Sequence, residues 1–238
     1  DLFLEASGSA AFWQMLEPQS LDGFIQEAQV RRLDGEAGAG DLRQLAEILS
    51  RMVDAKSPFT AEHSLGVAGV SRFLAGKMGL GELSQRKLEI AGLLHDVGKL
   101  RVPREILDKP GGLDARERQI INTHSFETYQ ILRDIQGFEE IAHWAVHHHE
   151  APDGRGFLFH IDASLLPLEA RILRIADIFQ AMVQDRPYRK GLDQAQALAF
   201  MASLSARGLA QPELVAHLIA CGDEAMAAAR SGLRQDTA

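Results

Sequence analysis

The sequence predicts an all-α protein. Apolar residues recur at spacings of three and four over most of the 238 residues, while the alternation typical of half-buried strands is nearly absent. Capping signals mark the ends of the longest helical segments. Since 46% of the residues are hydrophobic and 24% are charged, the composition is that of a globular chain that holds its core without disulfides or structural metals. Any metal site is therefore expected to serve a function.

The charge and the cysteine content exclude several classes of protein. The formal net charge of -8 does not favour binding to a nucleic acid polymer. Cys221 is the only cysteine, so no intrachain disulfide forms, which fits a reducing compartment and predicts a cytoplasmic location. No apolar run approaches the roughly 18 residues of a membrane span, and the start lacks the pattern of a signal peptide. We expect no membrane insertion of this segment.

Residues 1–40 are expected to form a short helical appendage and a linker, because residues 34–40 are mostly small and rich in glycine. Residues 41–238 are expected to form one helical domain. The appendage carries a set of large apolar residues: Phe12, Trp13, Leu16, Leu21, Phe24 and Ile25. Such a set favours packing or dimer contacts over a ligand site, so a homodimer is an expected partner. Because the chain begins at Asp1 rather than Met, we also expect a sensory or receiver domain upstream; the alternative is a complete chain with a trimmed start.

Within the domain, periodicity predicts helices in chain order at residues 41–55, 61–78, 84–94, 114–134, 139–149, 168–184, 193–206 and 212–229. Asp41 with Gln44 and Asp114 with Glu117 form capping pairs at the starts of the first and the fourth. Gly79 ends the second. The third runs into the sequence His-Asp-Val-Gly-Lys-Leu, and the fifth ends in three consecutive histidines. The sixth has strong helical periodicity, and the last two are rich in alanine and are expected at the periphery.

Residues 151–167 interrupt the helical pattern. Pro152, Gly154, Gly156 and Pro167 forbid a long helix there, although several apolar residues lie between them. We predict an ordered loop that covers a site.

Several histidines and one aspartate lie on apolar helix faces. His63, for example, shares a stripe with Val67 and Val70. The others are His95, His124, His148 and Asp177. A single buried histidine is usually a hydrogen-bonded core residue, but burying several imidazoles and two carboxylates without partners is costly, and metal coordination is the simplest compensation. Because the set contains no thiolate, it favours iron or manganese over structural zinc.

The adjacent pair His95 and Asp96 indicates two metals rather than one. A carboxylate has two oxygens and can bridge two ions, while the imidazole beside it binds one. Two metals about 3.5 to 4 Å apart hold a water as hydroxide near neutral pH and neutralise charge on a phosphodiester. The pair therefore predicts a hydrolytic metal centre.

His63, the pair His95-Asp96 and Asp177 match the H…HD…D signature of the HD superfamily of phosphohydrolases. Four segments resemble one branch of it, the HD-GYP domains: LLHDVGKL at 93–100, VPREILDKPG at 102–111, HHEAPDGRG at 148–156 and ADIF…DRPYR at 176–189. The resemblance covers about residues 41–205, in order and with suitable spacing. It is much more specific than an isolated His-Asp pair.

The resemblance implies an all-α HD-domain bundle with two divalent metals, usually iron or manganese. In that family a hydroxide bound to both metals hydrolyses the second messenger cyclic di-GMP, so the resemblance implies a phosphodiesterase with Asp96 and Lys99 as catalytic residues. One metal would be bound by His63, His95, Asp96 and Asp177. The other would be bound by Asp96, His124, His148 and His149. The substrate would be bound by Lys99, Arg186, Arg189 and Phe157, where lysine and arginine hold phosphate or guanine.

The sequence departs from the family in three places that bear on function, one of which is that His160 and Ala163 stand where the loop usually carries glycines. The tripeptide Gly-Tyr-Pro is replaced by Gly156-Phe157-Leu158, so the loop loses the tyrosine hydroxyl and the rigid proline, while Phe157 keeps an aromatic ring. Some members bind a third metal with a glutamate one turn before the first histidine. Phe59 stands at that position, and Glu62 points elsewhere, so we expect two metals.

Three functions stay open at this level. The first is the cyclic di-GMP phosphodiesterase. The second is a catalytically weak receptor that binds metal and cyclic di-GMP and signals by conformation, an alternative that the altered loop favours. The third is a phosphohydrolase acting on another cyclic dinucleotide or a nucleotide. Some of these residues also have a purely structural interpretation. Lys99 could be an ordinary lysine at a helix end, and Arg186 and Arg189 could be surface arginines. His147 is expected outside the set of metal ligands.

Overall fold

A computed structural model of the chain describes residues 39–56, 63–109, 111–185 and 189–230. These residues form helices joined by turns, with an isolated β-bridge between Asp153 and Asp162 and no strand among them. The elements are α4 (Ala39–Lys56), α5 (His63–Lys77), α6 (Glu82–Leu94), the 3-10 helix η1 (Val97–Arg101), α7 (Arg104–Leu107), α8 (Ala115–Asn122), α9 (His124–Leu132), α10 (Glu139–Val146), α11 (Leu168–Val183), α12 (Gln194–Ala206), α13 (Pro212–Ala220) and α14 (Gly222–Ala229). The predicted all-α class is confirmed. Each described helix is too short or too polar to serve as a membrane span. Residues 1–38, which hold most of the predicted appendage, lie outside the described residues, so the division at residue 40 stays a prediction.

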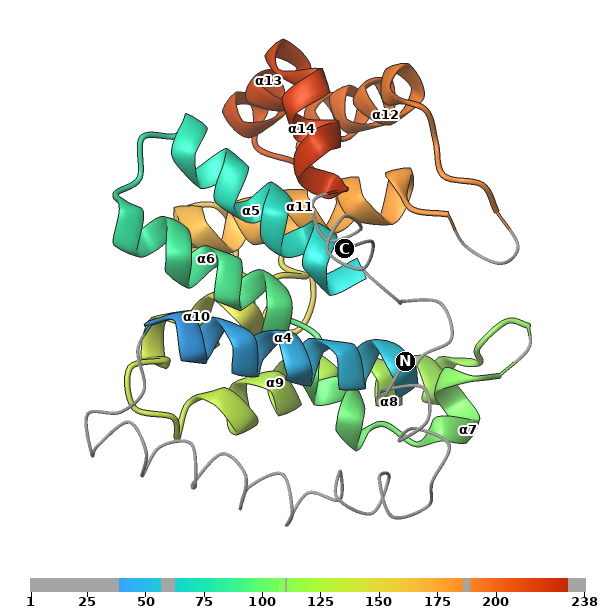
Figure 1. Cartoon of the computed structure of the whole chain (residues 1–238). Coiled ribbons are helices and arrows are strands. Elements are labelled where there is room, and N and C mark those ends of the chain that lie inside the picture. Colours follow the sequence, from blue (N-terminus) through green and yellow to red (C-terminus); the bar gives the residue numbers. More distant parts are fainter. Residues whose placement is uncertain (1–38, 57–62, 110, 186–188, 231–238) are drawn as a thin grey trace.

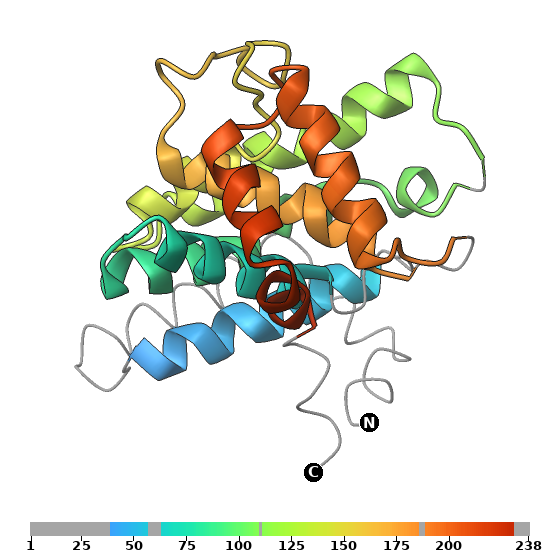
Figure 2. The same ribbon diagram turned by 90° about the horizontal axis from the view of Figure 1, so that it is seen from above.

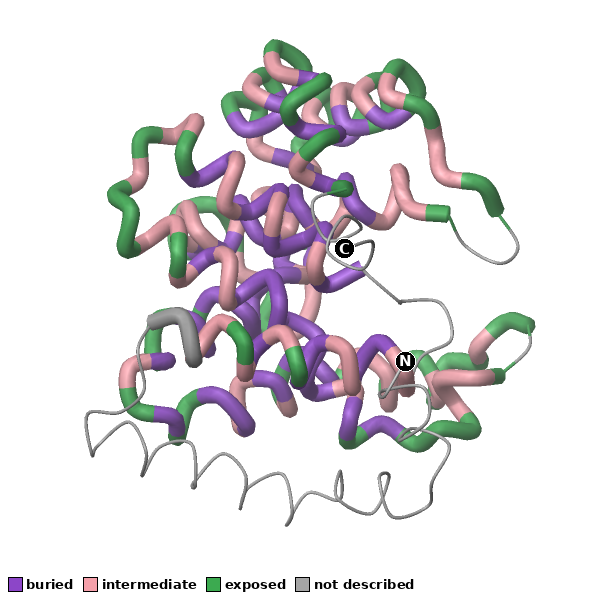
Figure 3. The backbone as a smooth tube through the Cα atoms, viewed as in Figure 1, coloured by how far each residue is buried: buried purple, intermediate pink, exposed green. Residues whose placement is uncertain are grey.

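The helices are arranged in three levels in Figure 1. α5, α6 and α11 pack together in the middle, with α12 to α14 above them and α4, α9 and α10 below. The view from above in Figure 2 looks nearly along α14, which contacts α5. Purple segments in Figure 3 concentrate where these levels meet. The largest fully buried side chains there include Leu74, Leu88, Leu132, Ile172 and Phe179, so one apolar core holds all three levels together.

Three predicted helix boundaries are wrong in informative ways. The helix expected over 114–134 is two helices that meet at Thr123, whose hydroxyl bonds the carbonyl of Ile120. The helix expected to continue to 149 ends at Val146, so the three histidines lie in a turn. Helices α13 and α14 meet at Cys221, where the backbone leaves the helical region. In each case the helix ends although the apolar pattern continues.

The capping predictions have mixed outcomes. Asp114 and Glu117 form the predicted box at the start of α8, with the Glu117 amide 2.8 Å from the Asp114 carboxylate. The predicted pair of Asp41 and Gln44 is wrong as a helix start, because α4 begins at Ala39. A further box, which the sequence analysis did not include, opens α12.

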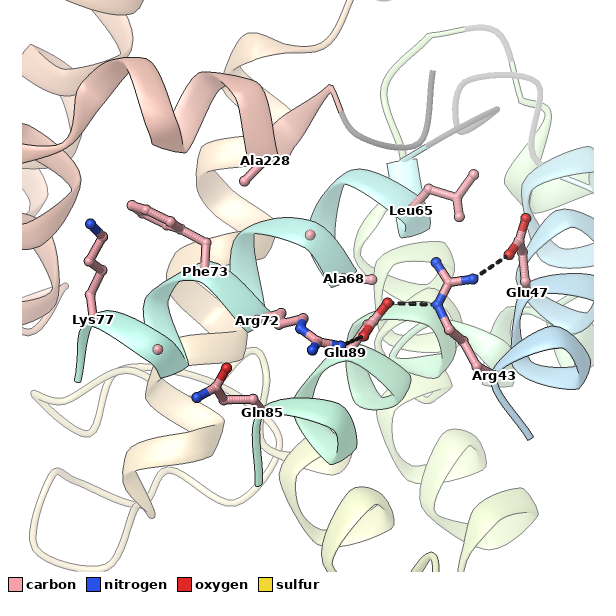
Figure 4. Close-up of a pocket in the computed structure, with 12 residues that line it drawn as sticks. Arg43, Glu47, Leu65, Ala68, Arg72, Phe73, Lys77, Gln85, Glu89 and Ala228 are labelled. Carbon is pink, nitrogen blue, oxygen red and sulfur yellow. Dashed lines mark hydrogen bonds and ion pairs between the residues drawn. The ribbon is translucent and has the colours of Figure 1, made fainter. Parts of the chain in front are cut away.

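The packing of α5 against α6 depends on a glycine. A Cβ added to Gly92 would lie 2.6 Å from the Cα of Ala68, so only glycine permits this approach. On the outer side, Arg43 of α4 and Arg72 of α5 both bind the carboxylate of Glu89 on α6, at 2.7 and 2.6 Å (Figure 4). These bonds border a cavity of about 720 Å³, whose lining contains none of the predicted metal ligands.

Candidate metal centre

The predicted metal ligands come from separate parts of the fold. His63 is the first residue of α5, and Asp177 lies in the middle of α11. His95 and Asp96 lie between α6 and η1, His124 begins α9, and His148 and His149 follow α10. The structure brings all of them together. Their donor atoms form three overlapping groups: His63 with His95 and Asp177, His95 with Asp96 and His148, and His124 with His148 and His149.

One side of this centre is formed by His63, His95 and Asp177. Nε2 of His63 lies 3.1 Å from Oδ1 of Asp177, and Nε2 of His95 lies 4.0 Å from the same oxygen. Nδ1 of His63 donates to Oε1 of Gln184 at 3.2 Å, a contact that the sequence analysis did not include. All donor atoms of this group lie within 4.8 Å of one another, a separation that permits one ion to bind them together.

The other side is formed by His124, His148 and His149. Nε2 of His124 lies 3.4 Å from Nε2 of His148 and 3.2 Å from Nε2 of His149. Asp96 lies between the two sides: Oδ1 is 3.2 Å from Nε2 of His124, while Oδ2 is 3.3 Å from Nε2 of His95. Each side therefore contacts a different oxygen of the same carboxylate.

The histidine rings are oriented by the main chain. Nδ1 of His95, His124 and His148 lies 2.8, 2.6 and 2.6 Å from the carbonyl oxygen of the residue three positions earlier. Because a carbonyl only accepts, each of these Nδ1 atoms carries a proton and each Nε2 is the nitrogen that faces the centre, which is the orientation of metal-bound histidines. Buried Nε2 of His95 and Oδ1 of Asp96 make no hydrogen bond within the described residues. A donor set of this kind fits divalent cations.

Burial and the carboxylates set the protonation of the metal-free centre. Burial lowers the pKa of His149 to about 3 and that of His148 well below its usual range, so both rings are neutral at physiological pH. Burial also disfavours the charged form of His95, but the neighbouring Asp96 and Asp177 outweigh it and raise the pKa of His95 to about 9. Against burial, the bond from His63 holds the pKa of Asp177 well below its usual range. A metal that binds His95 therefore competes with a proton.

Residues 47–214 match the family model described as HD domain. The chain belongs to the HD domain family. A 3'3'-cGAMP-specific phosphodiesterase of Vibrio cholerae is 38% identical over 69% of this chain and 38% of its own length. A cyclic di-GMP phosphodiesterase of Pseudomonas aeruginosa is 32% identical over 81% of this chain and 47% of its own. The chain thus spans less than half of either relative. The resemblance to HD-GYP domains is confirmed.

The fold of this HD domain has a counterpart among solved structures. An HDG"Y"P protein from Bdellovibrio bacteriovorus superposes with a TM-score of 0.58 at 16% identity, covering 86% of this chain and 71% of the other. At that level of identity the similarity concerns the fold, and it supports the helical HD bundle predicted from the sequence.

Lys99 lies at the edge of the candidate metal centre. Its ammonium donates a hydrogen bond to Oδ2 of Asp96, and its side chain remains one-fifth exposed. Burial disfavours the charge, but the Asp96 carboxylate outweighs burial, so the pKa of Lys99 is raised and the amine is protonated. The turn that presents it is fixed by Thr128, whose hydroxyl accepts from the Gly98 amide at 2.9 Å and donates to the His95 carbonyl at 3.0 Å. Lys99 is therefore a charged group held beside the predicted ligands.

The predicted substrate residues have different outcomes. Phe157 stacks on the ring of His149, with centroids 4.5 Å apart and an interplanar angle of 29°. Arg189 is exposed and bonds the carbonyl of Ala181 at 2.6 Å, and none of its described contacts is with the centre. Arg186 lies outside the described residues, as do Phe59 and Glu62, on which the expectation of only two metals depends. The structure thus places Phe157 at the centre and Arg189 at the end of α11.

Two polar contacts lie beside the centre, and sequence reasoning missed the second of them. Glu150 is fully buried and accepts a bond from the amide of Phe159 at 2.5 Å, which ties the loop to the turn after α10. Arg174 donates to the carbonyl of His149 at 3.1 Å. Its position one helical turn before Asp177 was the available signal, because residues three apart share a helix face.

Proposed function

We propose that this chain is a metal-dependent phosphodiesterase that hydrolyses a cyclic dinucleotide, with cyclic di-GMP as its substrate and iron or manganese as its metals. The observation that carries the proposal is the inward orientation of the Nε2 atoms around Asp96, with three Nδ1 atoms bonded to main-chain carbonyls. The names of the curated relatives, which act on cyclic di-GMP or 3'3'-cGAMP, supply the substrate class.

The proposed ligand sets divide the centre into two metal positions. His63, His95 and Asp177 would hold one cation, and His124, His148 and His149 the other. Asp96 would contact both, because each of its oxygens faces a different side. Two divalent cations supply Lewis-acid activation and a nucleophile for phosphodiester hydrolysis.

Residues of the chain itself would bind and stabilise the substrate. The Lys99 ammonium, held beside Asp96, would stabilise negative charge that develops on the phosphate. The ring of Phe157 has one face on His149 and would offer stacking to a base at the loop. Arg186 and Arg189 remain predicted contacts to phosphate or guanine. A cytoplasmic location, a homodimer and an upstream sensory or receiver domain likewise remain predictions.

A second candidate substrate is 3'3'-cGAMP. Two relatives from Vibrio cholerae, 38% and 39% identical to this chain, are named for that specificity. The two substrates differ in one base, so the chemistry proposed for the centre serves both. A receptor function is the alternative from a different class, and the same experiment separates it from hydrolysis.

The experiment combines metal analysis with a substrate panel. Protein purified without oxygen is loaded with iron or manganese, and metal content and turnover are measured on cyclic di-GMP, 3'3'-cGAMP, cyclic di-AMP and a mononucleotide phosphodiester. We expect two metals per chain and preferential hydrolysis of a cyclic dinucleotide. Asp96→Ala should lose metal and turnover. The control is Asp134→Ala, which changes an exposed aspartate just after α9 and should retain both. Two metals and tight binding without turnover would indicate the receptor; full activity of Asp96→Ala would exclude the proposed mechanism.

A further inference from the structure

Arg174 contacts the main chain of a predicted metal ligand. It lies on α11, one turn before Asp177, and is half-buried. Nη1 donates to the carbonyl oxygen of His149 at 3.1 Å, and Nε lies 3.5 Å from the carbonyl oxygen of Leu209, in the turn between α12 and α13. Within the described residues it has no carboxylate at ion-pair distance. Its donors are therefore directed at main-chain oxygens.

His149 is the histidine of the centre that depends most on such support. His95, His124 and His148 are each oriented by an Nδ1 bond to a carbonyl three residues earlier. His149 makes no comparable Nδ1 bond within the described residues. Its ring is held by the stacked ring of Phe157, and its carbonyl accepts from Arg174 and, at 3.3 Å, from the amide of Phe157. Of these two donors, only Arg174 stands on a helix.

We propose that Arg174 is a positioning residue that holds the main chain of His149 and thereby sets the affinity of the metal position formed by His124, His148 and His149. This inference rests on the metal centre of the proposed function. It adds one residue, Arg174, that determines how tightly a metal is bound there. Arg174 also contacts the carbonyl of Leu209, and it therefore connects the turn between α12 and α13 to the main chain of His149.

An arginine suits this position better than a lysine. The carbonyls of His149 and Leu209 are bonded through different nitrogens of one planar group, whereas a lysine offers a single ammonium. Burial lowers the pKa of Arg174, but a guanidinium stays protonated in proteins, so its donors are always available. Among the described residues, removal of Arg174 leaves the amide of Phe157 as the remaining hydrogen-bond donor to the carbonyl of His149.

The test is a titration of the metal-free protein with manganese, in which calorimetry measures the affinity of each metal position. Wild type is compared with Arg174→Met, Arg174→Lys and Arg207→Met, the last being the same change at an exposed arginine two residues from Leu209. We expect Arg174→Met to weaken one of two metal positions by about ten- to hundred-fold, the range typical of residues that orient metal ligands. Arg174→Lys should recover part of the affinity, and Arg207→Met should match wild type.

Two comparisons separate positioning from a general loss of structure. His149→Ala should weaken the same metal position as Arg174→Met, while His63→Ala should weaken the other. The melting temperature of the metal-free protein should be the same for Arg174→Met and wild type. The inference is overturned if Arg174→Met binds both metals with wild-type affinity, if it weakens both equally, if its metal-free form is destabilised, or if wild type binds fewer than two metals. A wild type that binds two metals but hydrolyses none of the panel refutes the proposed function alone.

Discussion

Lys99 donates a hydrogen bond to the oxygen of Asp96 that also faces Nε2 of His95. The other oxygen of Asp96 faces Nε2 of His124. Although burial alone would raise it, the pKa of Asp96 is held well below its usual range by Lys99 and the surrounding histidines. The carboxylate therefore stays ionised, and Lys99 is fixed next to it.

Replacement of Lys99 by methionine should separate metal binding from catalysis. The variant keeps the apolar stem but loses the charge, so we expect two metals per chain and a kcat lower by about a hundred- to a thousand-fold, as for loss of one group that stabilises transition-state charge. Metal content and kcat are measured together. Lys109→Met, a change at a surface lysine paired with Glu117, is the control. An unchanged kcat in Lys99→Met would show that this lysine is only structural.

The altered loop is tested by restoring the family tripeptide. Phe157 stacks on His149, and the amide of Phe157 bonds the carbonyl of the same residue. The double change Phe157→Tyr with Leu158→Pro adds a hydroxyl and restricts the backbone, and should raise turnover of cyclic di-GMP without changing the metal content. Steady-state kinetics measure the effect. Equal turnover in both proteins would remove the reason for assigning a receptor role to the native loop.

Asp54 is expected to destabilise the metal-free protein near neutral pH. It is buried on α4, where Ser64 donates to it at 3.1 Å, and burial raises its pKa to about 6, against opposing effects of His63 and Ser64. An acid with a raised folded pKa makes stability fall as pH rises from about 4 to about 6, because the unfolded state releases the proton first. At pH 7 the cost is at most about 3 kcal/mol.

Asp54→Asn should therefore be more stable than wild type, and its advantage at pH 7 should exceed that at pH 5 by about 1 kcal/mol. Urea unfolding of the metal-free proteins at both pH values measures this. Asp223→Asn, at an exposed site on α14, controls for the loss of a negative charge. A constant difference between pH 5 and pH 7 would mean that Asp54 does not titrate in this range.

Gly92→Ala should separate α5 from α6. The added Cβ would lie 2.6 Å from the Cα of Ala68, and overpacking of this kind typically costs about 1 to 3 kcal/mol. Since His95 follows three residues later, we also expect weaker metal binding. Gly76→Ala is the matched control, because the nearest atom there is 3.6 Å away on a flexible glutamine. Thermal unfolding compares the two, and equal stability would contradict the close approach described above.

Much of the architecture could be predicted from local patterns. Helical periodicity indicated an all-α protein because burial of one apolar face repeats with the helix period. The same periodicity failed at Thr123 and Cys221, where the backbone turns although the apolar pattern continues. Helix ends depend on hydrogen bonds of single residues with partners that the pattern does not show.

The sequence by itself determined the residue types of the metal centre, since His63, the pair His95-Asp96 and Asp177 recur in a recognisable order. Only the tertiary structure decided which nitrogen of each ring faces inward, which oxygen of Asp96 faces which side, and that Arg174 supports His149 across 25 positions of the chain. Ligand identity is a property of single residues and their spacing. The orientation of the ligand side chains depends on main-chain carbonyls and on donors that come into contact only after the helices pack. No local sequence pattern encodes those contacts.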